Sequence, residues 1–502
     1  MAGLMGSRRL VGSYLRRMPR QRTSQASLAW LNMHMNMAAA AAVAPMAQPR
    51  RSYSGSSSNL TWKQFLEGGS RGVSGAVAHE GGHRVKLSWV DGHTSEFSLK
   101  WLRDHSPGAF NSHTRQRELD TYAVPNDTRV KHASVETLPP SAADANSGAS
   151  EPPRQVLLLR WSSEANEAEH EECTVPIGWL RQHCSSETAR SLRQRFGTSI
   201  DGANHRPTPV LWGAGVFSPA ADNNPPIVEY DAVMEDRQGS PPSASPSSSA
   251  PTAASHLVGL IRSHGIALVR GVPTDEAGTQ ALALKVGGHV RSTLYGPDMW
   301  ATSAEADDGE EGFRDSAYSS DALALHTDCS YLRDPPGLQV FNCVIAAEEG
   351  GASIYLDGFA VAERLRVENP EAFDFFTRTS LKYQCFDEGC HYVAEGPIFR
   401  VGPLGVVDQV RHNDYDRAPL DALSTDDVDR FYEHHKSLSA LLRDPSMVAR
   451  ILLKPGETVI IDNQRAMHGR ETFKGSTRRR RRMVGCYLGM DEVESMARVH
   501  RL

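Results

Sequence analysis

Short apolar segments separated by glycine and proline recur through the second half of the chain, and this pattern limits the possible fold more than any other feature. They lie at 265–271, 338–346, 352–357, 398–408, 457–462 and 483–488. Segments of this length bounded by turn residues are typical of buried β-strands. Helical patterns occur near 360–378 and 424–443, and no internal repeat is evident. We therefore expect a mainly β sandwich or barrel with flanking helices.

A smaller β-rich region precedes this core. Residues 85–93 alternate in polarity and run into an Asp-Gly turn, and 155–161 are typical of a buried strand. The Pro/Ser/Ala-rich stretches 139–153 and 239–255 cannot bury a core, so we expect loops or linkers there. The predicted domains are an N-terminal domain over 60–212, a linker over 213–256 and a main domain over 257–502.

The N-terminal leader differs chemically from the rest of the chain. Residues 1–66 contain no Asp or Glu, and the first 51 carry eight arginines. Without those arginines the formal net charge of −6 becomes −14. Arg-rich, acid-poor leaders are typical of organelle import signals. We expect residues 1–53 to be a presequence, mitochondrial rather than plastid, cleaved near 50–54; a basic tail or nucleic-acid arm is the alternative.

Several classes of protein are disfavoured by composition. No stretch approaches the ~18 consecutive apolar residues of a membrane span. Seven scattered cysteines without a CxxC pair do not form a secreted disulfide framework or a zinc ribbon. The acidic body argues against nucleic-acid binding, although the arginine run 478–482 alone is compatible with it.

A candidate metal-binding set consists of His326, Asp328 and His468. His326 and Asp328 are two residues apart, so on a strand they would share a face. Two imidazoles and one carboxylate leave coordination positions open, an arrangement that suits non-haem Fe(II) holding a chelating co-substrate and O₂. The His-x-Asp tripeptide alone is weak, because it also occurs by chance in surface loops.

Three further features support this interpretation. Pro455 and Gly456 predict a turn before the apolar strand that leads to His468. Ser353 follows a Gly-Gly pair and places a hydroxyl 27 residues after His326. The arginines at 478–482 lie 10 to 14 residues beyond His468, where one could bind the far end of a dicarboxylate co-substrate.

Several motifs together resemble a known family. The matching segments are 295–296, 317–318, 326–343, 350–359, 411–418, 455–473 and 485–493. On these motifs, residues from about 215 to 502 resemble the Fe(II)/2-oxoglutarate dioxygenases of carnitine synthesis. Segments 412–418, 462–473 and 485–488 resemble the members acting on trimethyllysine more closely than those acting on γ-butyrobetaine.

The resemblance implies a fold and an activity. The expected fold is a double-stranded β-helix (jelly-roll) catalytic domain after a small β-rich N-terminal domain. The expected reaction is hydroxylation of N6,N6,N6-trimethyl-lysine at carbon 3, the first step of carnitine biosynthesis, with release of succinate and CO₂. The alternative is hydroxylation of γ-butyrobetaine to carnitine. The resemblance also implies Fe(II), 2-oxoglutarate as co-substrate, ascorbate as reductant and a homodimer, with no nucleic-acid or membrane partner.

The resemblance also implies roles for single residues. His326, Asp328 and His468 match the iron ligands, and Ser353 matches the hydroxyl that assists 2-oxoglutarate. Arg481 matches the arginine that binds this co-substrate, but five consecutive arginines leave the register open by one.

A quaternary ammonium has no N–H donor, so aromatic faces are expected to recognise the substrate. The candidates are Tyr295, Trp300, Tyr318, Tyr331 and Tyr487, each of which is equally compatible with an ordinary core position. Asp315, Arg411 or Asn413 could instead bind the amino-acid end of the substrate.

The N-terminal domain departs from the family pattern. The segment 101–104 (WLRD) matches, but the following residues 105–110 contain none of the cysteines that ligate zinc in relatives. We therefore predict no zinc in this domain. A catalytically silent jelly-roll binding protein is a second hypothesis for the whole chain, and the intact set of candidate iron ligands argues against it.

Overall fold

The structure is a computed structural model. It describes residues 62–499, apart from 112, 125, 139–153, 164–165, 197–206, 208, 219–224, 236–251, 304–318, 388, 403–404 and 475–480. The predicted presequence lies outside the described residues, as does much of the predicted linker.

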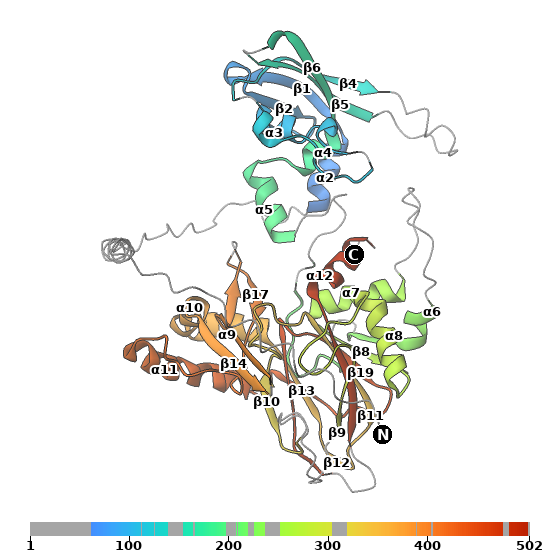
Figure 1. The fold of residues 1–502 in the computed structure, drawn as a ribbon, viewed down its shortest axis with the longest axis vertical. Coiled ribbons are helices and arrows are strands. Elements are labelled where there is room, and N and C mark those ends of the chain that lie inside the picture. The colour runs from blue at the N-terminus through green and yellow to red at the C-terminus, as the bar shows by residue number, and fades with distance from the viewer. Residues whose placement is uncertain are drawn as a thin grey trace, which may run out of the picture. The chain divides into compact units, whose positions relative to one another are not determined.

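The N-terminal part contains two antiparallel three-stranded sheets, each followed by a short helix (Figure 1). The first comprises β1 (Val73–His79), β2 (Arg84–Trp89) and β3 (Thr94–Ser98), followed by α3 (Leu99–Asp104); the second comprises β4 (Arg129–Leu138), β5 (Arg154–Ser163) and β6 (Asn166–Pro176), followed by α4 (Ile177–Gln182). Helices α2 (Trp62–Ser70) and α5 (Glu187–Phe196) complete this part.

This arrangement is an internal repeat that the sequence analysis missed. Trp101 in α3 and Trp179 in α4 both begin a Trp-Leu-Arg segment, and their rings stack with centroids 5.1 Å apart. His105 and His183 each follow their tryptophan by four residues and contact its carbonyl through Nδ1. The repeat escaped detection because little beyond these short segments is identical between the two halves.

The core of the N-terminal part comes from alternating strand residues. In β2 the buried positions are Val85, Leu87 and Trp89, and the residues between them are exposed. This period of two is what a sheet with one buried face requires. These side chains pack with buried residues of β5, including Leu157 and Leu159, in one hydrophobic cluster.

The C-terminal part is built on two larger sheets. The six-stranded sheet has the order β7 (Ile227–Glu229), β8 (Ile266–Arg270), β19 (Thr458–Asp462), β11 (Leu338–Ile345), β22 (Arg482–Leu488), β9 (Trp300–Ser303). The four-stranded sheet has the order β10 (Leu323–His326), β20 (Ala466–Arg470), β13 (Ser353–Asp357), β18 (Val448–Ile451). Neighbouring strands are antiparallel except for β7 and β8. Side chains from both sheets, such as Tyr355 and Ile461, pack in a shared hydrophobic cluster.

Three two-stranded sheets accompany these. They are β12 (Glu349–Gly350) with β21 (Phe473–Lys474), β14 (Leu381–Asp387) with β15 (Cys390–Gly396), and β16 (Phe399–Val401) with β17 (Val407–Val410). The single strand expected over 398–408 is therefore two strands, β16 and β17, which pair in antiparallel fashion.

Helices cover both sheets on the sides away from their shared cluster. Helices α6 (Tyr230–Glu235), α7 (Ala253–His264), α8 (Glu276–Gly287) and α12 (Met490–Val499) pack on the six-stranded sheet. Helices α9 (Gly358–Glu368), α10 (Pro370–Arg378) and α11 (Thr425–Leu442) pack with residues of the four-stranded sheet. The expectation of a mainly β fold with flanking helices is confirmed.

Local sequence explains where these helices begin and end. Thr252 caps α7 by accepting a hydrogen bond from the Ser255 amide, and Gly265 ends α7 in the left-handed conformation (φ 71°). The helical pattern expected over 360–378 is two helices. Asn369 caps α10 and Pro370 occupies its first turn, where proline starts a helix rather than continuing one.

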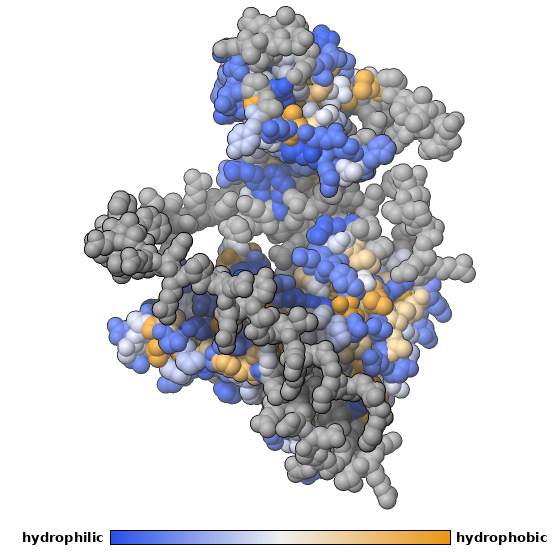
Figure 2. Space-filling model, in the orientation of Figure 1, coloured by the Kyte–Doolittle hydropathy of each residue, from blue (hydrophilic) through white to orange (hydrophobic). Residues whose placement is uncertain are grey.

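None of the helices in the described ranges combines the length and the apolar character of a membrane span. Figure 2 shows that hydrophilic residues dominate the described surface on the face drawn, and hydrophobic residues form only separated groups there.

Candidate metal and substrate site

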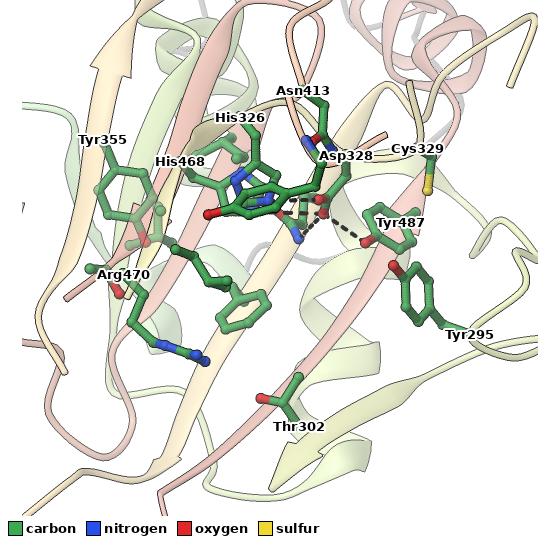
Figure 3. A pocket seen from close by; sticks show the side chains of 18 of the residues that line it. Tyr295, Thr302, His326, Asp328, Cys329, Tyr355, Asn413, His468, Arg470 and Tyr487 are labelled. Carbon is green, nitrogen blue, oxygen red and sulfur yellow. Dashed lines mark hydrogen bonds and ion pairs between the residues drawn. The ribbon is translucent and has the colours of Figure 1, made fainter. Parts of the chain in front are cut away.

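A cavity of about 110 Å³ lies between the two sheets of the C-terminal part (Figure 3). The four-stranded sheet contributes residues of β10, β13 and β20, and the six-stranded sheet contributes residues of β9, β11, β19 and β22. The loop after β17 adds Asn413, Tyr415 and Asp416. The cavity therefore draws on segments that are far apart in the sequence.

His326, Asp328 and His468 converge at this cavity. His326 ends β10 and pairs with His468 across the β10–β20 ladder, which brings their ring centroids to 4.4 Å. The Nε2 atom of His326 lies 3.3 Å from Asp328 Oδ1, and that of His468 lies 3.7 Å from Oδ2. One ligand atom from each residue lies within 4.8 Å of the others, so the three can hold a single metal ion.

The two imidazoles, of His326 and His468, differ in their hydrogen bonds and in the direction of their pKa shifts. His326 Nδ1 lies 2.7 Å from the Ala324 carbonyl, which fixes the proton on Nδ1 and leaves Nε2 as an acceptor. Burial lowers the pKa of His468 to about 4, so this ring is neutral at neutral pH and available as a ligand. Burial opposes a charge on His326, but its contact with Asp328 raises its pKa above the usual value.

Asp328 is held by a dense set of hydrogen bonds. Its Oδ2 accepts from the Tyr487 hydroxyl at 2.7 Å and from the Gln339 amide at 2.6 Å. Asn463 accepts from its backbone amide at 2.7 Å and donates to its carbonyl at 3.1 Å. Burial would raise the pKa of Asp328, but His468 and His326 hold it below its usual range. The side chain is therefore a carboxylate.

Ser353 and Arg481 both line the same cavity. Ser353 begins β13, and Arg481 lies immediately before β22; both side chains are buried. Among the described residues no carboxylate pairs with Arg481, and burial lowers its pKa. Arg482 is exposed, because neighbouring positions near a strand face opposite ways. Residues 478–480 lie outside the described residues.

Arg470 is a second buried arginine at the cavity, and the sequence analysis did not single it out. Its Nη2 donates to the carbonyls of Ser319 and Asp321 at 2.6 and 2.9 Å. Burial, and next Arg481, lower the pKa of Arg470 to about 10. Arg470 and Arg481 are therefore two cations in a cavity whose only acids, among the described lining residues, are Asp328 and Asp416.

Four of the five predicted aromatic residues line the cavity. Tyr295, Trp300 and Tyr487 form one group, with ring centroids 6.1 Å apart for Tyr295–Trp300, 6.2 Å for Tyr295–Tyr487 and 5.5 Å for Trp300–Tyr487. Tyr331 also lines it, with its ring stacked on Tyr392 at 5.9 Å. Tyr318 lies outside the described residues. Figure 3 shows Tyr295 and Tyr487 on the side of Asp328 opposite to Tyr355 and Arg470.

Of the two described residues considered for the far end of the substrate, Asn413 lines the cavity and Arg411 does not. Arg411 is buried, and its guanidinium donates to the carbonyls of Ser330, Leu332 and Arg333 at 2.6, 2.9 and 3.1 Å. That arginine therefore holds a loop together rather than facing the cavity. Asp315 lies outside the described residues.

The sequence analysis also missed Gln339 and Asn463, which orient Asp328. Both are polar residues within or beside apolar strands, and a polar side chain at a buried position is the one signal that marks them. Their partner was invisible from the sequence, because Asn463 lies 135 residues from Asp328.

Comparison with known proteins agrees with this geometry. The model of the taurine catabolism dioxygenase TauD, TfdA family matches residues 236–487, and the model of the γ-butyrobetaine hydroxylase-like N-terminal domain matches 76–138. Mitochondrial trimethyllysine dioxygenases of Rattus norvegicus and Homo sapiens are each 30% identical over 412 residues, covering 80% of this chain and 82% of theirs.

More distant matches exist as well. A γ-butyrobetaine dioxygenase of Pseudomonas sp. is 27% identical over 415 residues, covering 82% of this chain and 92% of that protein. Among solved structures, PvcB from Pseudomonas aeruginosa is 21% identical and aligns with a TM-score of 0.36, covering 47% of this chain and 80% of that one.

Proposed function

The chain belongs to the taurine catabolism dioxygenase TauD, TfdA family, and we propose that it hydroxylates N6,N6,N6-trimethyl-lysine at carbon 3 in carnitine biosynthesis. It is a 2-oxoglutarate-dependent dioxygenase. The observation that carries a substrate with a trimethylammonium head is the group of three aromatic rings beside the His326, Asp328 and His468 cluster.

The similarity to relatives supports trimethyllysine over γ-butyrobetaine. Relatives named trimethyllysine dioxygenase reach 30% identity, whereas those named γ-butyrobetaine dioxygenase reach 27% and 24%. Both substrates carry the same trimethylammonium head, so the aromatic group alone does not separate them.

The residues at the first cluster fit Fe(II). His326, Asp328 and His468 would hold it through two imidazole nitrogens and one carboxylate, and the remaining coordination positions would face the cavity. Bound Fe(II), together with 2-oxoglutarate and O₂, supplies the oxidant for C–H hydroxylation, with succinate and CO₂ as co-products.

Arg481 and Ser353 are the residues we assign to 2-oxoglutarate. A buried guanidinium without an acidic partner in the described part of the chain suits a carboxylate at the far end of the co-substrate. The Ser353 hydroxyl, which lines the same cavity, adds a hydrogen-bonding group.

Tyr295, Trp300 and Tyr487 would bind the trimethylammonium head. The head cannot donate hydrogen bonds, so it gains most from aromatic faces in a site that excludes water. The three rings are partly or fully buried. Their centroids lie 5.5 to 6.2 Å apart, so the rings form one continuous aromatic wall. Tyr318 and Tyr331 remain further candidates for this role.

The remaining expectations extend the proposal. We infer a double-stranded β-helix for the catalytic domain over 257–502, an N-terminal domain over 60–212 and a linker over 213–256. The mitochondrial relatives and the acid-free leader support a mitochondrial location after removal of a presequence over 1–53. Ascorbate as reductant and a homodimer complete the proposal.

A direct assay tests the substrate. The full chain is reconstituted anaerobically with Fe(II), given 2-oxoglutarate and O₂ with each substrate separately, and analysed by mass spectrometry and succinate measurement. We expect one added oxygen atom on trimethyllysine with matching succinate, and none on γ-butyrobetaine. Oxygen added to γ-butyrobetaine alone would contradict the proposed substrate.

A further inference from the structure

A second cluster of ligand side chains lies outside the cavity. His412 and Asp414 follow β17 (Val407–Val410), and His435 lies within α11 (Thr425–Leu442). One ligand atom from each residue lies within 4.8 Å of the others, the same convergence that the first cluster shows. None of the three lines the catalytic cavity, although Asn413, between His412 and Asp414, does.

Surrounding residues contact His435 Nδ1 and Asp414 Oδ1, and this leaves His435 Nε2 and Asp414 Oδ2 facing each other within the cluster. His435 Nδ1 lies 3.1 Å from the Ser439 hydroxyl, and a proton assigned to Nδ1 leaves the lone pair on Nε2. Arg417 donates to Asp414 Oδ1 at 3.0 Å, which leaves Oδ2 as the atom nearest His435. Outer partners that orient a histidine and a carboxylate in this way are typical of metal sites.

The inner atoms lie at a distance that metal ligands adopt. His435 Nε2 is 3.2 Å from Asp414 Oδ2, and tetrahedral zinc with bonds of about 2.0 Å separates its ligands by about 3.3 Å. The Nε2 atom is buried and has no hydrogen-bond partner among the described residues, so its closeness to Asp414 is not a well-directed hydrogen bond. The His412 and His435 ring centroids are 6.0 Å apart.

The protonation states also suit a cation. Burial lowers the pKa of His412 to about 4, so this ring is neutral at neutral pH. Burial would raise the pKa of Asp414, but its contacts with His435, His412 and Arg417 hold it below the usual range. Imidazole nitrogens and a carboxylate oxygen are donors that zinc accepts.

We propose that His412, Asp414 and His435 form a second divalent-metal site, of the zinc class, with a water molecule completing a tetrahedron. Asp414 is the exposed member of the cluster, and it gives the ion a route from solvent. The site is independent of the proposed substrate and of the first cluster.

Such an ion would stabilise the wall of the catalytic cavity. The Thr327 amide donates to the His412 carbonyl at 2.7 Å, and the His412 amide donates to the Thr327 hydroxyl at 3.1 Å. Thr327 lies between His326 and Asp328 in the chain. A metal that fixes His412 and Asp414 would therefore restrain the loop that carries Asn413, Tyr415 and Asp416 into the cavity.

Zinc retention tests the site directly. The full-length chain carrying His326→Ala, which disables the first cluster, is stripped of metal, incubated with Zn²⁺, desalted and analysed for metal. We expect about one zinc ion per chain. Adding His435→Gln is expected to weaken zinc binding at least tenfold. Losing a metal ligand lowers metal affinity more than losing a residue that only hydrogen-bonds to a ligand, which itself typically lowers it about tenfold or more. His289→Gln, at an exposed histidine paired with Glu492, is the matched control and should retain zinc.

Two additions keep the test decisive. Asp414→Asn removes a ligand at an exposed position, so it answers the question if His435→Gln fails to fold, as judged by circular dichroism. Hydrogen exchange of amides 411–418 in the chain with only His326→Ala should slow on zinc addition, and His435→Gln should abolish this change. If no zinc is retained, or if the ligand variants retain as much as the control, the site does not exist.

Discussion

The Tyr487 side chain is predicted to have two separable roles, and two substitutions distinguish them. Its hydroxyl donates to Asp328 Oδ2 at 2.7 Å, and its ring belongs to the aromatic wall with Tyr295 and Trp300. Tyr487→Phe removes only the hydroxyl, whereas Tyr487→Ala removes both. We expect the first to weaken Fe(II) binding alone, and the second to weaken Fe(II) binding and substrate binding.

The size of the hydroxyl effect follows from the contacts of Asp328. A hydrogen bond to a charged group contributes roughly 1.5–3 kcal/mol. Gln339 still donates to the same oxygen at 2.6 Å after the substitution, so the lower part of this range, about 1.5–2 kcal/mol, is the better expectation. At about 1.4 kcal/mol for each tenfold change, Tyr487→Phe should weaken Fe(II) binding by roughly 10–30-fold.

The ring effect is estimated separately. A cation above a desolvated aromatic face gains about 2 kcal/mol, so Tyr487→Ala should raise the KM for trimethyllysine by roughly 30-fold. Tyr487→Phe keeps the face, and its KM should stay within about twofold of the wild-type value. The KM for 2-oxoglutarate should change much less than that for trimethyllysine in the alanine variant.

The assay combines anaerobic Fe(II) titration with steady-state kinetics at saturating iron. Tyr392→Phe is the control, because Tyr392 is 38% exposed and does not line the cavity. Wild-type Fe(II) affinity in Tyr487→Phe would refute the inference that the hydroxyl orients Asp328. Equal rises in the two KM values in Tyr487→Ala would refute the aromatic role.

Three further substitutions test the rest of the site and its support. His326→Ala should abolish succinate production, and retained turnover would remove it from the ligand set. Arg481→Lys should raise the KM for 2-oxoglutarate at least about tenfold because the bidentate contact is lost, whereas the exposed Arg482→Lys should not; equal effects would reassign the co-substrate arginine. Asp357→Ala should lower the free energy of unfolding by about 3–5 kcal/mol in urea titrations. The substitution leaves the fully buried Arg465 guanidinium without its carboxylate partner, which it contacts at 2.9 and 3.0 Å. A loss below about 1 kcal/mol would contradict this expectation.

Individual strands could be predicted from the sequence because a buried strand appears there as a short apolar segment bounded by turn residues. The segments 265–271, 338–346 and 457–462 correspond to β8, β11 and β19 within one residue at each end. Their order in the sheet was not readable, since β19 pairs with both β8 and β11 across more than a hundred residues of chain. The repeat in the N-terminal part escaped for a related reason, because its halves share backbone geometry more than side chains.

The candidate metal ligands could be proposed from the sequence because their chemistry depends on residue type and short spacing. His326 and Asp328 are two residues apart, and the motif around His468 is contiguous. What surrounds them depends on tertiary structure. The hydroxyl of Tyr487 contacts Asp328 across 159 residues, and Asn463 does so across 135.

The sequence by itself therefore determined several core strands, the helical regions near 360–378 and 424–443, and the identity of the chemistry-bearing groups, since each leaves a local pattern. Only the tertiary structure decided which of the described arginines in the 478–482 run lines the cavity. Arg481 and Arg482 are the same residue type at adjacent positions, and they differ in that Arg481 faces the cavity whereas Arg482 is exposed. It also brought His435 on α11 beside His412 and Asp414, which no spacing in the chain indicates. Distant side chains converge through tertiary packing, and a local sequence pattern does not show which distant segments will pack together.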